Sequence, residues 1–265
     1  MSHEGTGGIQ VSEVITNRAA IGFFGKQPAH GDFLNRRLPN AFTSVWDHWL
    51  ELAINESRQQ LDEAWLNAYL TSPLWRFALS SGLCGEACWT GVLMPSVDNV
   101  GRYFPLTLAA ALPERTDLAD LMFNNEAWFN QCEEMALSAL QNNFSLDAFD
   151  KELRNASTPH VKLSSQTTMQ STPLQVHVEL PSLDPFNSGI QSLKDYLSSQ
   201  LPEQCCLWWT HGSESIAPSL LITEGLPVKE RYASLLDGDW EGRSWQQYDL
   251  TEHKESNHNT RHQAQ

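Results

Sequence analysis

Two short segments of this sequence, 25–39 and 91–105, gather the side chains whose chemistry could serve a function. The polar candidates of the first are Lys26, His30, Asp32, Arg36 and Arg37. Those of the second are Asp98, Arg102 and Tyr103. The first segment holds three positive charges against one negative charge, in a chain whose formal net charge is −15. Because arginine and aromatic side chains concentrate binding energy, and loops on a rigid scaffold often carry function, both segments are candidate partner-binding sites.

Catalysis is the first chemistry to consider for these residues. Gly25-Lys26 follows an apolar run, but a phosphate-binding loop needs a longer glycine loop and a hydroxyl residue after the lysine, where this chain has Gln27 and Pro28. The Gly-x-Ser-x-Gly pattern of a nucleophile elbow is absent. We therefore expect no enzyme, no catalytic residues and no cofactor. The alternative is a small-molecule-binding or hydrolytic pocket, formed by His30, Asp32, Asp98 and Arg102.

The five cysteines do not have the spacing of a metal site. Cys84 and Cys88 are four residues apart, and no second close pair with zinc-ligand spacing accompanies them, since Cys205-Cys206 lies inside an apolar run. An odd number of cysteines in a chain of this length indicates reduced, small apolar residues of a cytosolic protein. We therefore expect no metal.

The charged groups of both segments also have a purely structural interpretation. Arg36 or Arg102 would then pair with Asp32 or Asp98 inside the fold and hold two turns in place. The sequence leaves this alternative open beside partner binding.

Composition excludes several other classes of function. A surface as acidic as a net charge of −15 implies repels phosphate backbones, so we expect no nucleic-acid partner. No apolar run approaches the roughly 18 residues that cross a bilayer, so we expect no direct membrane insertion. The first 20 residues contain Glu4 and Glu13 and no apolar run, which predicts a cytoplasmic protein without a signal peptide.

Hydrophobic periodicity predicts the elements that position these segments. Residues 40–61 form the clearest helix, since their apolar side chains recur at three- and four-residue spacing. A second helix is expected over 63–70. Further helices are expected over 116–123, 126–142 with Asn124 or Asn125 as its cap, 146–153, 189–199 and 230–236. Short apolar runs bounded by turn formers predict strands over 21–24, 74–79, 88–94, 104–112, 174–180, 205–210 and 219–223.

This order of elements predicts one α/β (α+β) domain over 18–250, with a mixed or antiparallel central sheet flanked by helices. The second half supplies too few elements to bury a core of its own. Residues 1–17 and 251–265 are expected to be a disordered leader and tail. Residues 155–172, rich in Ser, Thr and Gln, are expected to be a surface loop or insertion.

Several motifs along the chain resemble the TagF family of type VI secretion-associated proteins of Gram-negative bacteria. In the first half they are Gly25-Lys-x-Pro-x-x-Gly-Asp-Phe33, Arg37-Leu-Pro39, Trp46-Asp-x-Trp-Leu50, Trp65-Leu-x-x-Tyr-Leu70, Trp75-Arg-Phe77, Gly91-Val-Leu-Met-Pro-Ser-Val-Asp98 and Gly101-Arg-Tyr-Phe-Pro105. In the second half they are Leu207-Trp-Trp-Thr210, Pro218-Ser-Leu-Leu-Ile222 and Gly225-Leu-Pro227. The resemblance spans roughly 21–240.

The resemblance implies a post-translational negative regulator, or repressor, of type VI secretion that acts by protein–protein interaction. Its implied partner is the cytoplasmic forkhead-associated scaffold protein Fha. Some family members are fused to a protein phosphatase that this chain lacks, so an adaptor for a separate phosphatase is a further alternative. The family supplies no catalytic residues, and a longin-like α/β/α sandwich is the fold we expect.

Overall fold

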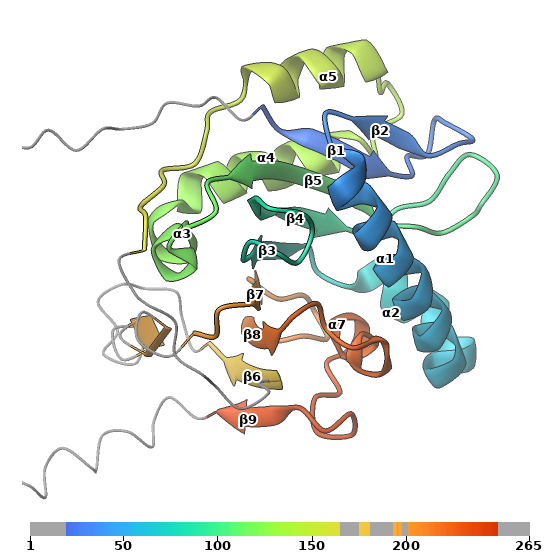
Figure 1. The fold of residues 1–265 in the computed structure, drawn as a ribbon. Coiled ribbons are helices and arrows are strands. Elements are labelled where there is room, and N and C mark those ends of the chain that lie inside the picture. Colours follow the sequence, from blue (N-terminus) through green and yellow to red (C-terminus); the bar gives the residue numbers. More distant parts are fainter. Residues whose placement is uncertain (1–19, 165–174, 181–192, 195, 198–200, 249–265) are drawn as a thin grey trace, which may run out of the picture.

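A single nine-stranded sheet with helices on both faces forms the centre of the molecule (Figure 1). The computed structural model describes residues 20–164, 175–180, 193–194, 196–197 and 201–248. The strand order is β2-β1-β5-β4-β3-β7-β8-β6-β9, and all neighbours are antiparallel except the parallel pair β6 and β9. The expected α/β class with a mixed sheet flanked by helices is therefore confirmed. The longin-like arrangement and the single-domain bounds 18–250 stay predictions.

The strands agree closely with the apolar runs of the sequence. They are β1 (Gly22–Gly25), β2 (Leu34–Arg36), β3 (Trp75–Leu79), β4 (Cys88–Met94), β5 (Leu106–Leu112), β6 (Gln175–Glu179), β7 (Cys205–Thr210), β8 (Ser219–Glu224) and β9 (Gln246–Tyr248). Two of these strands, β2 and β9, were not predicted. Both are three-residue strands at the edges of the sheet, and they carry polar residues that give no apolar run.

The helices are α1 (Asn40–Leu61), α2 (Trp65–Thr71), α3 (Leu118–Asn124), α4 (Glu126–Ser138), α5 (Leu146–Asn155) and α7 (Ser234–Asp237). Short 3-10 turns, Asp62–Ala64 and Lys229–Arg231, precede α2 and α7. The bounds predicted for α1 are confirmed, whereas the expected helix 230–236 is split between a 3-10 turn and α7. The expected leader, the tail and most of the helix 189–199 lie outside the described residues.

The helices divide into two layers, one on each face of the sheet (Figure 1). Helices α3, α4 and α5 pack on one face, in a core that includes Phe23, Phe129 and Trp209. Helices α1, α2 and α7 pack on the other face, in an aromatic core that includes Trp46 and Trp208. Because both faces are covered, central strands such as β7 are buried along their whole length and read as continuous apolar runs.

The cap predicted for α4 is only partly correct. Asn125 does occupy the N-cap position, but its side chain makes no capping bond. Its Nδ2 donates to the carbonyl of Leu121, and its Oδ1 accepts from the backbone N–H of His160. Asn125 therefore ties the described part of the expected 155–172 loop to the junction between α3 and α4.

The described residues also bear on the cysteines and on membrane insertion. All five cysteines are free and buried, which agrees with the prediction that they are reduced, small apolar residues. No helix in the described ranges is long and apolar enough to cross a membrane.

Candidate functional site

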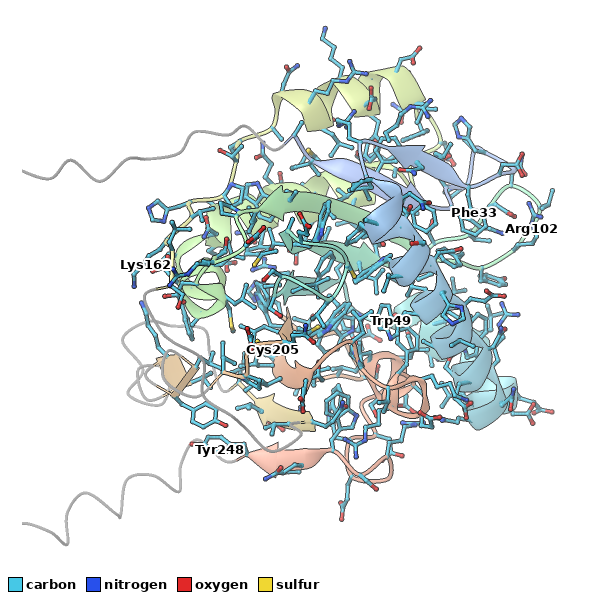
Figure 2. All side chains as sticks on the ribbon, in the orientation of Figure 1. Phe33, Trp49, Arg102, Lys162, Cys205 and Tyr248 are labelled. Carbon is cyan, nitrogen blue, oxygen red and sulfur yellow. The ribbon has the colours of Figure 1, made fainter. Side chains whose placement is uncertain are left out.

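Two hairpin loops meet at one end of the sheet. Residues 26–33 join β1 to β2, and residues 95–105 join β4 to β5. Strands β1, β5 and β4 are neighbours, and both Gly25 and Met94 pair with Leu106. The two segments singled out in the sequence therefore lie side by side, and Figure 2 shows Phe33 and Arg102 near each other at this end.

A glycine at the end of β1 lets the two loops approach closely. Gly25 has a φ of 131°, and a Cβ there would lie 2.0 Å from the carbonyl oxygen of Pro105. Any other residue would collide with backbone and would also be strained in this conformation. Gly25 is thus required where the first segment crosses the second.

Asp98 is the centre of the polar contacts between the loops. Its Oδ2 accepts from Lys26 Nζ at 2.9 Å and from Arg102 Nε at 2.7 Å. Its Oδ1 accepts from the backbone N–H groups of Val100 at 3.1 Å and Arg102 at 2.8 Å. Arg102 also donates to the carbonyl of Gly31, which connects the second loop back to the first. The carboxylate therefore holds four donors from two segments.

These contacts decide the charge state of Asp98. Burial of its side chain disfavours the charged form, but the bonds from Arg102, Lys26 and Val100 outweigh this and hold the pKa of the carboxyl well below its usual range. Asp98 is thus a charged structural hub whose lone pairs are already engaged, rather than a free general base.

The first loop is also anchored to the neighbouring helix layer. Gln27 Nε2 donates to the carbonyl of Ala139 at 2.7 Å, just beyond α4. Gln27 Oε1 lies 2.8 Å from His30 Nδ1, and the carbonyl of His30 accepts from the backbone N–H of Asn99. The ring of His30 packs edge-on against Phe144. His30 therefore holds the loop in place and is not arranged as one half of an acid–base pair with Asp32.

The second loop is anchored to α2. The hydroxyl of Tyr69 donates to the carbonyl of Ser96 and accepts from its backbone N–H, at 2.8 and 2.9 Å. Ser96 Oγ donates to the carbonyl of Lys26 at 2.8 Å. Tyr103 turns inward, with its ring 5.7 Å from Trp65 and 5.8 Å from Tyr69. This loop is therefore fixed along most of its length.

An aromatic side chain remains exposed on top of this anchored base. Phe33 stacks on Phe24, with ring centroids 5.6 Å apart, and meets Phe104 edge-on at 4.8 Å. Lys26 Nζ lies 5.1 Å from the centroid of the Phe33 ring. Even so, Phe33 is 47% exposed, and Val100 in the other loop is 68% exposed. We call Phe33, Val100 and the exposed side chain of Arg102 the loop surface.

Two adjacent arginines at the end of β2 have different surroundings. Arg36 is exposed, and among the described residues its guanidinium makes a single bond, to the neighbouring carbonyl of Asn35. The guanidinium of Arg37 makes two bonds to the carbonyl of Ile21 and one to Asp150 on α5. Arg37 also has a φ of 63°, a conformation that costs a residue with a side chain about 1 kcal/mol or more. Arg36 is thus free to bind a partner, whereas Arg37 closes the fold.

The structure therefore separates the eight residues predicted for the site. Four of them are joined through the two loops: Lys26, His30, Asp98 and Arg102. Asp32 and Arg36 are exposed beside them, Tyr103 faces the interior, and Arg37 bonds to a different part of the molecule. The structural interpretation holds for the Arg102–Asp98 pair, while partner binding by any of the eight stays a prediction.

Phe33 is not among the eight site residues predicted from the sequence. A phenylalanine is buried in most proteins, so its type gave no reason to place it on the surface. The available signal was its position directly after Gly31-Asp32, in a segment otherwise made of turn-forming and charged residues.

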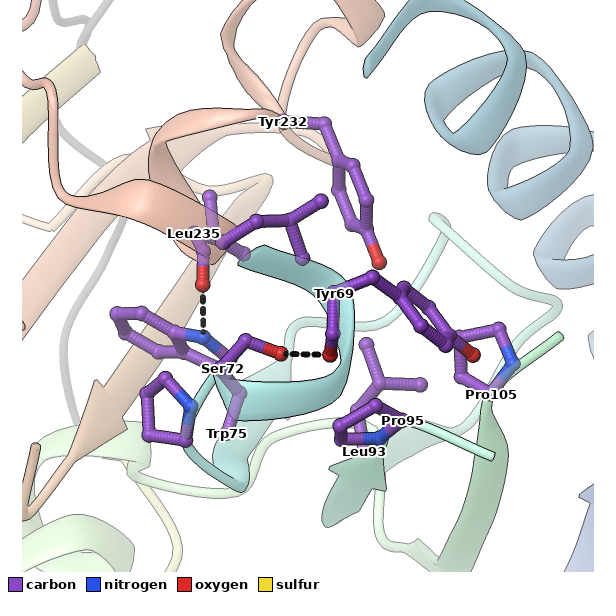
Figure 3. Close-up of a pocket in the computed structure, with 10 residues that line it drawn as sticks. Tyr69, Ser72, Trp75, Leu93, Pro95, Pro105, Tyr232 and Leu235 are labelled. Atoms are coloured by element: carbon purple, nitrogen blue, oxygen red, sulfur yellow. Dashed lines mark hydrogen bonds between the residues drawn. The ribbon is translucent and has the colours of Figure 1, made fainter. Parts of the chain in front are cut away.

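A pocket lies where the two ends of the second loop, Pro95 and Pro105, meet α2 and α7 (Figure 3). Its cavity volume of about 10 Å³ is roughly the space that one water molecule needs, far below that of a ligand pocket, and it lies between α2, α7 and the sheet. Its walls include Tyr69, Trp75, Tyr232 and Leu235, and the bonds from Ser72 to Tyr69 and from Trp75 to Leu235 close its sides. None of the residues expected to form a small-molecule pocket lines it.

Both the sequence and the fold are similar to those of known proteins. Residues 22–156 match a family described as the TagF N-terminal domain, type VI secretion system-associated. The structure is similar to the crystal structure of PA0076 from Pseudomonas aeruginosa, with a TM-score of 0.68 and 37% sequence identity. That similarity covers 83% of this chain and 94% of the other. No curated protein matches the sequence.

Proposed function

Because the chain belongs to the TagF family of type VI secretion system-associated proteins, we propose that it is a post-translational negative regulator of this secretion. In this proposal it acts in the cytoplasm by stoichiometric binding to an Fha-type forkhead-associated scaffold protein. Occupying the scaffold keeps it from the assembling secretion apparatus, and no catalytic step is needed.

The exposed ring of Phe33 is the observation that carries the binding site. A large aromatic side chain at the surface leaves apolar area in contact with water, which a partner would remove. The loops beneath it are held by the bonds of Asp98, Gln27 and Tyr69, so little conformational freedom is lost on binding. A rigid aromatic anchor of this kind is typical of the centre of a protein interface.

Charge supports an acidic binding face on the partner. Lys26, Arg102 and the exposed Arg36 carry three positive charges against the two negative charges of Asp98 and the exposed Asp32, which leaves a net charge of +1. This local excess of positive charge stands in a chain of net charge −15. Complementary charge of this kind steers encounter and disfavours wrong partners more than it adds affinity.

The test is a titration of the purified full chain with the purified Fha-type scaffold. Phe33→Ser is expected to weaken binding by about tenfold or more, as the truncation of a central aromatic anchor does. Leu137→Ser is the matched control, since Leu137 on α4 is 48% exposed, close to the 47% of Phe33. Both variants should stay folded, because each side chain is about half exposed, and the thermal midpoint of each variant checks this.

Three results would count against the proposal. Equal affinity of Phe33→Ser and the parent would exclude the loop surface. Failure of the parent to bind the scaffold would exclude the partner itself. Binding to a separate protein phosphatase but not to the scaffold would favour the adaptor alternative.

A further inference from the structure

A second exposed apolar strip runs along helix α1, beside the segment 224–230. Two hydrogen bonds hold the segment against the helix. Trp49 Nε1 donates to the carbonyl of Pro227 at 2.8 Å, and Lys229 Nζ donates to Glu56 at 2.9 Å. Leu52 lies between these contacts on the helix, and Val228 lies between them on the segment. Leu52 and Val228 therefore face solvent next to each other, each more than two-fifths exposed.

The strip continues along the helix toward its first turn. Val45 is exposed and lies seven residues before Leu52, which places the two on one side of α1 about 10 Å apart, with the exposed His48 between them. An apolar pair at this spacing matches the apolar residues that a second helix presents at positions seven apart. We call Val45, Leu52 and Val228 the α1 strip.

Carboxylates lie at both ends of the α1 strip. At the start of α1, a Cβ at Gly85 would lie 3.3 Å from Ala41, and a Cβ at Gly82, in the same loop, would lie 2.7 Å from the side chain of Gln204. The backbone N–H of Gly225 donates to the carbonyl of Gln204, so three loops converge there. Each of these loops carries an exposed glutamate: Glu86, Glu203 and Glu224. At the other end, Glu56 and Glu230 both lie near Lys229. Arg58 and Arg231 add two further cations there, stacked over Trp65 and Trp245. The excess of acid therefore lies at the start of α1, beside Val45.

Two further carboxylates lie on α1 itself. Asp47 and Glu51 are four residues apart, and this spacing brings two carboxylates together on a helix and destabilises it. Burial raises the pKa of Asp47, the charge of Glu51 raises it further, and the neighbouring His48 opposes both effects in part. Neither carboxylate forms an ion pair within the described part of the chain.

We propose that the α1 strip is a second docking surface, which binds a basic amphipathic helix of a protein partner. The partner's apolar residues, at positions seven apart, cover Val45, Leu52 and Val228, and its lysines or arginines meet the surrounding glutamates. This inference goes beyond the proposed function, because the loop surface is positive and would select a partner of the opposite charge. A second copy of this chain is disfavoured, since a symmetric contact would bring the same carboxylates against each other.

The test uses the full chain and a fluorescent amphipathic peptide made of leucine and lysine, with leucines at three- and four-residue spacing. We expect saturable binding by fluorescence anisotropy that weakens strongly between about 50 mM and about 300 mM salt. Leu52→Ser should weaken it by about tenfold, and Glu51→Lys combined with Glu230→Lys by more. A peptide of the same composition without an apolar face should bind much less tightly.

Two control variants make the test specific. Leu66 on α2 has the same exposure as Leu52, 42%, so Leu66→Ser should leave binding unchanged. Glu152 is an exposed residue of α5, on the opposite face of the sheet, so Glu152→Lys should also leave peptide binding unchanged. All these side chains are exposed, so each variant is expected to fold, which a thermal midpoint within about 3 °C of the parent would verify.

The inference is overturned if Leu52→Ser and Leu66→Ser behave alike, or if the peptide without an apolar face binds equally well. Either result would show that the peptide binds only through general electrostatic attraction to an acidic protein. A dimer in solution that Leu52→Ser dissolves would also overturn it, in favour of self-association.

Discussion

The loop surface and the α1 strip differ both in charge and in what holds them in shape. The loop surface is positive and lies on two hairpin loops, whose conformation depends on buried bonds to Asp98, Gln27 and Tyr69. The α1 strip has an excess of acid at one end and lies mainly on a regular helix whose buried face packs on the sheet. A surface built on loops is rigid only while its polar contacts survive, whereas a surface built on a helix needs no such support. Single polar substitutions should therefore disrupt one and spare the other.

Asp98→Asn is expected to disrupt the loop surface more than any other single substitution while leaving the α1 strip intact. The amide cannot replace the charge of Asp98, so Lys26 is left buried without its counter-ion. We expect a marked fall in the thermal midpoint and loss of scaffold binding, with peptide binding at the α1 strip unchanged. Asp32→Asn is the control for stability, because Asp32 is exposed and forms no ion pair within the described residues. Equal stability of Asp98→Asn and the parent would show that the loops do not depend on this hub.

The same residue should give the protein an acid-sensitive component. The pKa of Asp98 is lowered in the folded state, so its stabilisation is complete above the usual aspartate pKa of about 3.9 and is lost as pH falls below it. The parent should therefore lose stability from about pH 4 downward more steeply than Asp98→Asn. Urea unfolding at several pH values measures this, and parallel profiles for the two proteins would contradict it.

Arg37→Glu and Arg36→Glu should separate structure from binding within one dipeptide. Arg37→Glu removes three bonds and places a carboxylate beside Asp150, so we expect about 2 kcal/mol lower stability toward unfolding. Arg36→Glu should change stability by less than about 0.5 kcal/mol. It should nevertheless weaken scaffold binding and slow association at low salt. If Arg37→Glu is as stable as the parent, its contacts contribute nothing.

Tyr69→Phe should have a smaller effect and sharpen the role of the loop anchors. It leaves the carbonyl and N–H of buried Ser96 without the tyrosine hydroxyl, at a cost of about 1 kcal/mol. The scaffold should bind more weakly by a few-fold, because the loop loses part of its rigidity. Chemical denaturation and a binding titration measure the two effects. Weaker stability with unchanged affinity would disconnect the α2 anchor from the loop surface.

Sequence patterns predicted the regular elements well because those depend on local periodicity. The bounds of α1, β4 and β7 follow directly from apolar spacing and from the turn formers at their ends. The strand β2 could not be found this way, since Leu34–Arg36 has no apolar run and exists only through its pairing with β1.

The site was predictable in its segments but not in its contacts. Lys26 and Asp98 are 72 residues apart, and Arg37 and Asp150 are 113 apart, so no spacing in the sequence connects either pair. Only the order of the strands brings the first pair together. The exposure of Phe33 depends in turn on the neighbouring rings of Phe24 and Phe104, which fill one side of it and leave the other open.

Hydrogen exchange of the full chain, measured with and without the Fha-type scaffold, tests the central claim most directly. If the loop surface holds the scaffold, amides within 26–36 and 95–104 should exchange more slowly in the complex. Amides within 45–60 and 224–231, at the α1 strip, should be unchanged. Protection confined to the α1 strip, or none in the two loops, would contradict the account.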